Sequence, residues 1–123
     1  MRVFLGLVIA AIYLTPLPVH AQALDGNAIK TTFFNGQPFI ASSPTRQRYT
    51  MVFTPDGKAT RESLGKAGEK VDGKWKVVKE GFCTQWKDGP FNCYRLVPST
   101  VAEGKWAVMK GATTVATWAK QQP

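Results

Sequence analysis

Two cysteines, Cys83 and Cys93, are the residues of this sequence with the most distinctive chemistry. Nine residues separate them, so they do not form the Cys-x-x-Cys pair of a thiol oxidoreductase, and no third soft ligand accompanies them for zinc. Both lie five residues from Asp88, so a hairpin centred there places them opposite each other on neighbouring strands. Opposed cysteines in an oxidising compartment form a disulfide. The spacing therefore predicts a Cys83–Cys93 bond that staples a hairpin.

Acid–base chemistry has few candidate residues. His20 is the only histidine, and it falls within an N-terminal leader described below. The mature chain would therefore lack the histidine that Ser-His-Asp and Cys-His sites and the usual zinc sites require. The eight carboxylates lie mostly in turns and loops, where a solvated role is sufficient. We expect no catalytic residue, metal or cofactor, and hence no enzyme.

The first 23 residues have the organisation of a secretory signal peptide. A single arginine, Arg2, precedes a run of twelve apolar residues, and prolines and small residues follow. The run is shorter than the roughly 18 to 20 residues of a membrane-spanning helix. Cleavage fits either before Gln22 or before Leu24. We expect a signal peptide over 1–23 and a single domain over 24–123, periplasmic or secreted, with no stable membrane insertion after cleavage.

Basic residues form a second group of candidates, because the chain has a formal net charge of +8. Seven of them cluster in two stretches of the sequence: Arg46 and Arg48, then Lys66, Lys70, Lys74, Lys76 and Lys79. A basic surface attracts anionic partners, here an anionic envelope polymer or an acidic protein. Lysine-rich strands also protect sheet edges and keep small proteins soluble, so the charge alone identifies no partner.

A short helix is predicted within residues 24–36. Asp25 or Asn27 can cap its N-terminus, apolar residues recur at helical spacing after them, and Gly36 can end it. These signals predict one helix before the first strand.

After residue 36 the sequence changes to short runs of β-branched and aromatic residues separated by turns. This spacing is typical of an antiparallel sandwich or barrel. The predicted strands cover residues 38–42, 47–54, 59–64, 74–79, 82–86, 91–97, 100–110 and 112–119. Residues 65–73 contain glycines and alternating charges and are predicted to be an exposed loop. The single β-rich domain is therefore predicted to be a small antiparallel β-barrel or twisted sandwich of about eight strands, with one short N-terminal helix.

Several glycines, cysteines and aromatic residues also occur at a familiar spacing. A Gly-x-Trp strand is followed by a Cys-x-x-Trp strand and a Cys-Tyr pair, and a Tyr-x-Met-x-Phe-x-x-Asp-Gly hairpin precedes them. The residues are Gly73, Trp75, Cys83, Trp86, Cys93 and Tyr94, with Tyr49, Met51, Phe53, Asp56 and Gly57 upstream. In this pattern, over roughly residues 24–110, the chain resembles small secreted bacterial proteins of a domain-of-unknown-function family. The resemblance implies a compact β-fold in the periplasm and no particular activity.

The function predicted from these features is non-catalytic binding of an unknown partner, with the basic surface favouring an anionic one. One alternative is a protein similar to lysozyme or protease inhibitors, which would use the hairpin tip Lys87, Asp88 and Gly89. A staple at this tip would lower the entropic cost of binding.

A second alternative is a small barrel that binds an apolar ligand. Its cavity would be lined by some of Trp75, Trp86, Trp106, Trp118, Phe53 and Met109. Core filling is the simpler use of these side chains, so the tryptophans are predicted to form much of the core. The aromatic residues around the cysteines are predicted to be core and hairpin-packing residues rather than a binding platform; they are Phe82, Trp86, Phe91 and Tyr94.

Overall fold

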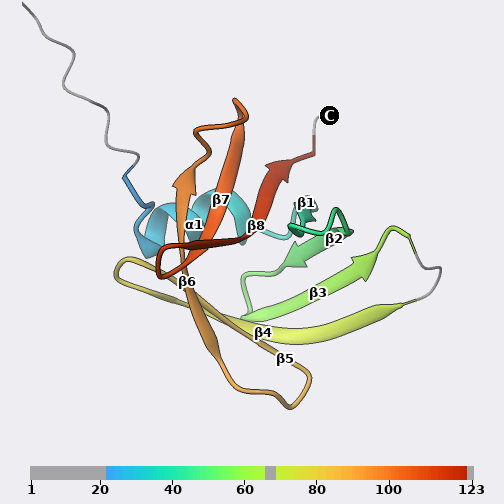
Figure 1. The fold of residues 1–123 in the computed structure, drawn as a ribbon. Helices are drawn as coiled ribbons and strands as arrows, with labels where there is room; N and C mark the ends of the chain where they lie inside the picture. The colour runs from blue at the N-terminus through green and yellow to red at the C-terminus, as the bar shows by residue number, and fades with distance from the viewer. Residues whose placement is uncertain (1–21, 66–68, 122–123) are drawn as a thin grey trace, which may run out of the picture.

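A computed structural model describes residues 22–65 and 69–121 and shows a mainly β protein (Figure 1). Within these residues one helix precedes eight antiparallel strands. Their bounds are α1 Gly26–Phe33, β1 Phe39–Ser42, β2 Arg48–Phe53, β3 Lys58–Ser63, β4 Lys70–Val78, β5 Gly81–Trp86, β6 Asn92–Pro98, β7 Lys105–Lys110 and β8 Thr113–Lys120. The strands follow one another around a closed barrel in chain order. The predicted fold class is confirmed, and of the two predicted arrangements the chain adopts the barrel.

The barrel closes where β1 pairs with β8. Ile40 lies opposite Ala119 on β8 and opposite Thr50 on β2, so β1 has a partner on both sides. Closure leaves no strand edge unpaired. Along each strand side chains alternate between the interior and the exterior, as on β2, where Met51 and Phe53 are buried.

The helix α1 begins where the sequence places a capping residue. The Asp25 carboxylate accepts a hydrogen bond of 2.8 Å from a backbone N–H of the first turn, so Asp25 rather than Asn27 is the N-cap. The helix ends at Phe33, and Gly36 follows with a φ of 87°, a conformation that favours glycine. The Gly36 N–H then donates to the Phe53 carbonyl at 2.8 Å, which attaches the helix to β2.

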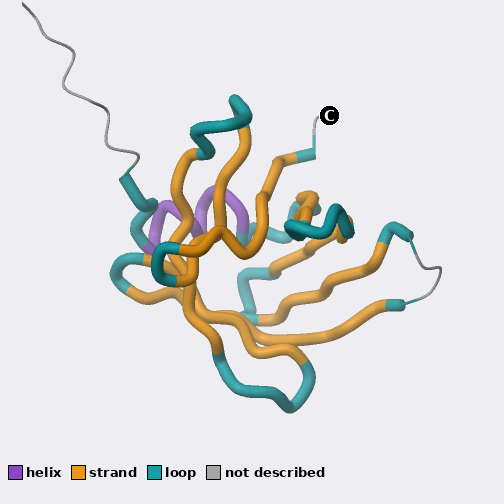
Figure 2. The backbone as a smooth tube through the Cα atoms, viewed as in Figure 1, coloured by secondary structure: helices purple, strands orange, loops and turns teal. Residues whose placement is uncertain are grey.

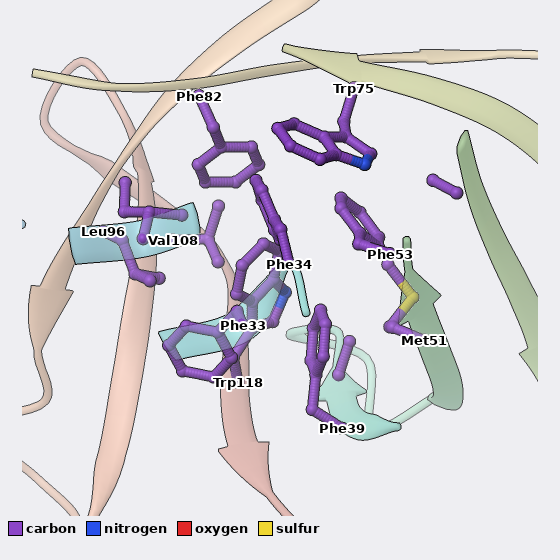
Figure 3. Close-up of a cluster of buried hydrophobic side chains, with 13 residues drawn as sticks. Phe33, Phe34, Phe39, Met51, Phe53, Trp75, Phe82, Leu96, Val108 and Trp118 are labelled. Carbon is purple, nitrogen blue, oxygen red and sulfur yellow. The ribbon is translucent and has the colours of Figure 1, made fainter. Parts of the chain in front are cut away.

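The end of α1 inserts two phenylalanines into the barrel (Figure 3). The ring centroid of Phe34 lies 4.5 Å from that of Phe53 and 4.6 Å from that of Trp75. Phe33 meets Trp118 edge to face, with ring centroids 5.4 Å apart. The largest fully buried side chains include five phenylalanines, whereas two of the four tryptophans are only partly buried. Phenylalanine therefore contributes more to this core than the tryptophans named in the sequence analysis.

Two predicted boundaries are wrong. β4 begins at Lys70, so the end of the predicted loop over 65–73 is a strand, because its backbone pairs with β3. The predicted strand over 100–110 is too long, since β7 begins only at Lys105 and Gly104 has a φ of 77° in the preceding turn. In both cases backbone pairing, rather than side-chain pattern, decides where the strand starts.

The predicted disulfide is present. Cys83 and Cys93 are bonded and lie directly opposite each other on β5 and β6, and Thr84 faces Asn92 as the hairpin register predicts. Thr84 and Tyr94 point to the barrel interior, so the bond lies on the outer side of the wall. The cysteines are therefore a structural staple, as expected from their spacing.

No helix in the described part of the chain is long and apolar enough to cross a membrane. The predicted signal peptide over 1–23 falls almost wholly on residues 1–21, which lie outside the described residues. It stays a prediction.

Candidate functional site

The two ends of the barrel are built differently (Figure 2). The β2–β3, β4–β5 and β6–β7 connections lie at the end that α1 covers, which we call the helix end. There the Gly26 N–H donates to the Lys79 carbonyl at 3.2 Å, which holds the start of α1 against the β4–β5 turn. The β1–β2, β3–β4, β5–β6 and β7–β8 connections lie at the opposite end, which we call the open end.

A cavity of about 290 Å³ extends into the barrel from the open end. Its deepest walls are aromatic and include Phe53, Phe82 and Trp118, which also contact the helix phenylalanines. Two small residues, Ala41 on β1 and Ala116 on β8, line one side and leave the space unfilled. The cavity is therefore the part of the barrel interior that the core side chains do not reach.

Arg61 is the charged residue among the described residues that line this cavity. It lies on β3 two residues after the buried Ala59, and this spacing turns both side chains to the same face. The guanidinium carbon lies 4.6 Å from the ring centroid of Trp86 and 5.9 Å from that of Tyr49. These distances fit cation–π contact, so two aromatic rings hold the Arg61 head at the open end.

Trp86 reaches Arg61 because its neighbour on β4 is a glycine. Gly73 lies directly opposite Trp86, and a Cβ at Gly73 would lie 2.6 Å from atom Cε3 of the indole ring. Any larger side chain would displace the ring. The Gly73 position therefore allows Trp86 to cover the wall of the cavity and to support Arg61.

Hydroxyl groups complete the polar part of the cavity. Thr84 is buried, and Tyr94 is partly buried near Arg61. Burial raises the pKa of the Tyr94 hydroxyl, and the positive charge of Arg61 opposes this in part. At neutral pH the phenol is protonated, so Tyr94 can donate a hydrogen bond into the cavity.

The described residues that line the cavity include no histidine, aspartate, glutamate or cysteine. Across residues 22–65 and 69–121, no group of three such side chains is placed to hold a metal ion. The cavity offers apolar surface, one cation and several hydroxyls. Small-molecule sites usually combine apolar walls with a few polar groups in this way.

The basic residues predicted as an anionic-partner surface are exposed but not gathered in one place. They are Arg46 and Arg48 beside the β1–β2 connection, Lys70, Lys74 and Lys76 along β4, and Lys79 in the β4–β5 turn. Lys66 lies outside the described residues. Arg48 and Lys70 both lie toward the open end, on strands that β3 separates, and the exposed Glu62 of β3 pairs with Lys70. Lys79 lies at the helix end, so the predicted residues extend along the outer wall from one end of the barrel to the other.

The predicted hairpin tip forms a defined turn at the open end. Lys87 has a φ of 54°, and the Gly89 N–H donates to the Trp86 carbonyl at 3.1 Å. The Gln85 side-chain amide donates to the Gly89 carbonyl at 2.8 Å. Lys87 and Asp88 are exposed there. The tip is thus shaped by local hydrogen bonds and lies beside the cavity.

The sequence pointed to some of the cavity residues and missed others. Trp86, Trp118 and Phe53 line the cavity, while Trp75, Trp106 and Met109 do not. Tyr94 lines it as well and, as predicted, packs against the core, with its ring centroid 5.5 Å from that of Phe82. Phe91, for which core or hairpin packing was also predicted, is exposed, and the Lys76 ammonium lies 4.6 Å from its ring centroid. Arg61 was not singled out. The sequence did contain a signal for Arg61: it lies two residues from Ala59 in a predicted strand, and this spacing places both side chains on the same face.

Comparisons with protein-family models, with curated proteins and with solved structures found no match. The resemblance to small secreted bacterial proteins stays a prediction. Any function for this chain must therefore be argued from its own barrel and cavity.

Proposed function

We propose that this protein is a non-catalytic binding protein whose barrel holds one small, largely apolar molecule in the cavity at the open end. The observation that supports this most directly is the cavity itself, which combines an aromatic floor with a few polar side chains. Ligand sites have this composition. Barrels of this size either fill with their own side chains or hold one small ligand.

The volume of the cavity sets the size of the ligand. A buried apolar cavity of about 150 Å³ binds benzene, and the cavity described here is about 290 Å³. A molecule about the size of two fused aromatic rings, or a short aliphatic chain, therefore fits. Larger ligands would have to extend out past the open end.

The other two predicted binding modes have less support. The basic residues are exposed on separate parts of the barrel, so a single anionic polymer would contact only some of them. The hairpin tip is well formed, but its exposed Lys87 and Asp88 carry opposite charges, and the exposed ring of Phe91 beside it is contacted by Lys76. Buried aromatic or arginine anchors usually dominate tight protein interfaces.

The same proposal includes export to an oxidising compartment, periplasmic or extracellular. The Cys83–Cys93 disulfide supports it, because such bonds persist where thiols are not kept reduced. The predicted leader over 1–23 supports it independently of the fold.

The test is a titration of the purified protein with a neutral apolar dye, N-phenylnaphthylamine, whose two fused rings match the cavity and whose phenyl ring can extend past the open end. Dye fluorescence reports binding. We expect saturable binding of one dye per chain. Ala116→Phe should abolish it, because the new ring occupies the cavity that Ala116 lines. Ala112→Phe is the matched control, since Ala112 is exposed in the β7–β8 turn.

Circular dichroism should show the same β spectrum for both variants and the wild type. Ala116→Leu fills less space and serves if the phenylalanine variant fails to fold. Equal dye binding by the wild type and the Ala116 variants would place the dye elsewhere. Absence of binding to the wild type would contradict a ligand cavity.

A further inference from the structure

We infer that the ligand of this barrel carries an anionic group, most simply a carboxylate, and that Arg61 binds this group while the apolar part of the ligand lies on the aromatic floor. This inference rests on the proposed function, because it names the chemical class of the molecule that the cavity holds. It depends on where Arg61 lies, on what surrounds it and on the order of side chains along the barrel.

The backbone register fixes Arg61 inside the barrel. It lies opposite Met51 on β2 and Val71 on β4. Met51 is buried and lines the same cavity. Arg61 is therefore held on the interior face by pairing on both sides, rather than by the free swing of a surface side chain.

The charge of Arg61 has no acidic partner in the cavity. Among the described residues that line it there is no aspartate or glutamate, and the adjacent Glu62 is exposed on the opposite face of β3. Arg61 is partly buried, and removing a charge even in part from water has a cost unless the charge is paired. Trp86 and Tyr49 compensate in part through their rings, but ring faces leave the N–H groups in the guanidinium plane without acceptors.

A carboxylate on the ligand would accept hydrogen bonds from the Arg61 guanidinium better than a neutral group would. The guanidinium presents parallel N–H donors that match the two oxygens of a carboxylate, and such charge-assisted pairs are roughly twice as strong as neutral hydrogen bonds. Tyr94 lines the same cavity opposite Phe82, and its protonated hydroxyl is a further donor there. The cavity thus offers a positive charge at Arg61 and a hydroxyl donor on the same interior surface.

The order of side chains along the strands sets the orientation of the ligand. On β5 the cavity residues run from Phe82 through Thr84 to Trp86, from the core toward the open end. Arg61 contacts Trp86, so it lies nearer the open end than Phe82 does. An anionic group on Arg61 therefore leaves the apolar body of the ligand directed inward, onto Phe82 and Trp118.

The test compares two probes of nearly the same shape, naphthoate and naphthamide, at neutral pH and low salt. Quenching of tryptophan fluorescence reports binding, because Trp86 and Trp118 line the cavity. We expect the wild type to bind naphthoate at least about tenfold more tightly than naphthamide, as a charge-assisted pair would provide.

Arg61→Gln should remove this preference and leave the affinity for naphthamide within about twofold of the wild type. Arg61→Lys keeps the charge but loses the paired donors, so it should retain only part of the preference. Arg48→Gln is the matched control, because Arg48 is exposed on the outer face of β2. It should behave as the wild type. Circular dichroism confirms the fold of each variant.

The outcomes separate this inference from the proposed function. If the wild type binds both probes equally, the cavity is a ligand site but Arg61 does not select an anion, and the inference is wrong. If Arg48→Gln loses the preference as Arg61→Gln does, surface charge is responsible and the inference is again wrong. Binding of neither probe to the wild type contradicts the proposed function itself.

Discussion

The helix end and the open end of this barrel are made of similar strands but filled in opposite ways. At the helix end, Phe33 and Phe34 of α1 pack among the interior aromatic rings and leave those side chains almost fully buried. At the open end none of the described residues forms a helix, and the interior holds a cavity of about 290 Å³ lined by a charged residue. The comparison shows that the closely packed core and the open cavity have separate locations in the same barrel.

Small residues on β1 and β8 keep the open end unfilled while the helix end is packed. Ala41 and Ala116 line the open-end cavity, whereas Phe39 on β1 and Trp118 on β8 fill the interior nearer the helix end. A barrel of this width can be filled completely by larger side chains. The cavity thus follows from residue choice on β1 and β8, and not from the number of strands.

The largest effect should come from removing a ring at the helix end. Phe34→Ala should lower the free energy of unfolding by about 3 to 5 kcal/mol, because the cavity left behind is enclosed. Trp86→Ala at the open end should lower it less, since Trp86 is only partly buried and borders a space that already exists. Urea denaturation measures both. Equal losses would mean that the two ends are packed alike.

A smaller effect should follow from removing the staple on the outer wall. Cys83→Ala with Cys93→Ala should lower the free energy of unfolding by about 2 kcal/mol, because so short a loop constrains the unfolded chain only modestly. The barrel and its ligand cavity should survive. The control is the wild type with the disulfide reduced, which should match the double variant. A double variant as stable as the oxidised wild type would show that the bond does not stabilise the fold.

The smallest effect is a pH dependence at the helix end. The Thr54 hydroxyl and then the Lys58 N–H donate to the Asp56 carboxylate and lower its pKa below the usual 3.8. A carboxyl whose folded pKa is lowered stabilises the fold above pH 3.8, and this contribution is lost as the pH falls through the folded value.

Thr54→Val should therefore reduce the loss of stability in acid. Thr113→Val, exposed at the open end, should leave it unchanged. Urea denaturation between neutral and acidic pH gives the comparison. If the Thr54 variant loses as much stability in acid as the wild type does, carboxylates other than Asp56 are responsible for that loss.

Local signals predicted much of this fold. The capping carboxylate of Asp25, the turn around Asp88 and the paired spacing of Cys83 and Cys93 each act within a few residues, so the sequence pattern was enough to predict them. The start of β4 was missed because Lys70 and its neighbours owe their strand structure to pairing with β3. The side chains of these residues show no alternating pattern that would reveal the pairing in the sequence.

The candidate site was predicted less well. Trp86, Trp118 and Phe53 were named as cavity residues, but so were Trp75 and Met109, which do not line it. Period-two alternation tells which side chains share a face, but not how deep in the barrel each one lies. Depth follows from the shear between strands and from the position of α1, and both arise only on closure.

By itself, the sequence determined a stapled, helix-capped chain of alternating strands with an excess of positive charge, because each of these features depends on neighbouring residues or on composition. Only the tertiary structure decided that the strands close, that α1 fills one end, and that Arg61 faces inward onto Trp86 at the other. These outcomes depend on contacts between residues distant in the chain. For the same reason, a single arginine within β3, rather than either basic cluster of the sequence, becomes the charge that lines the cavity.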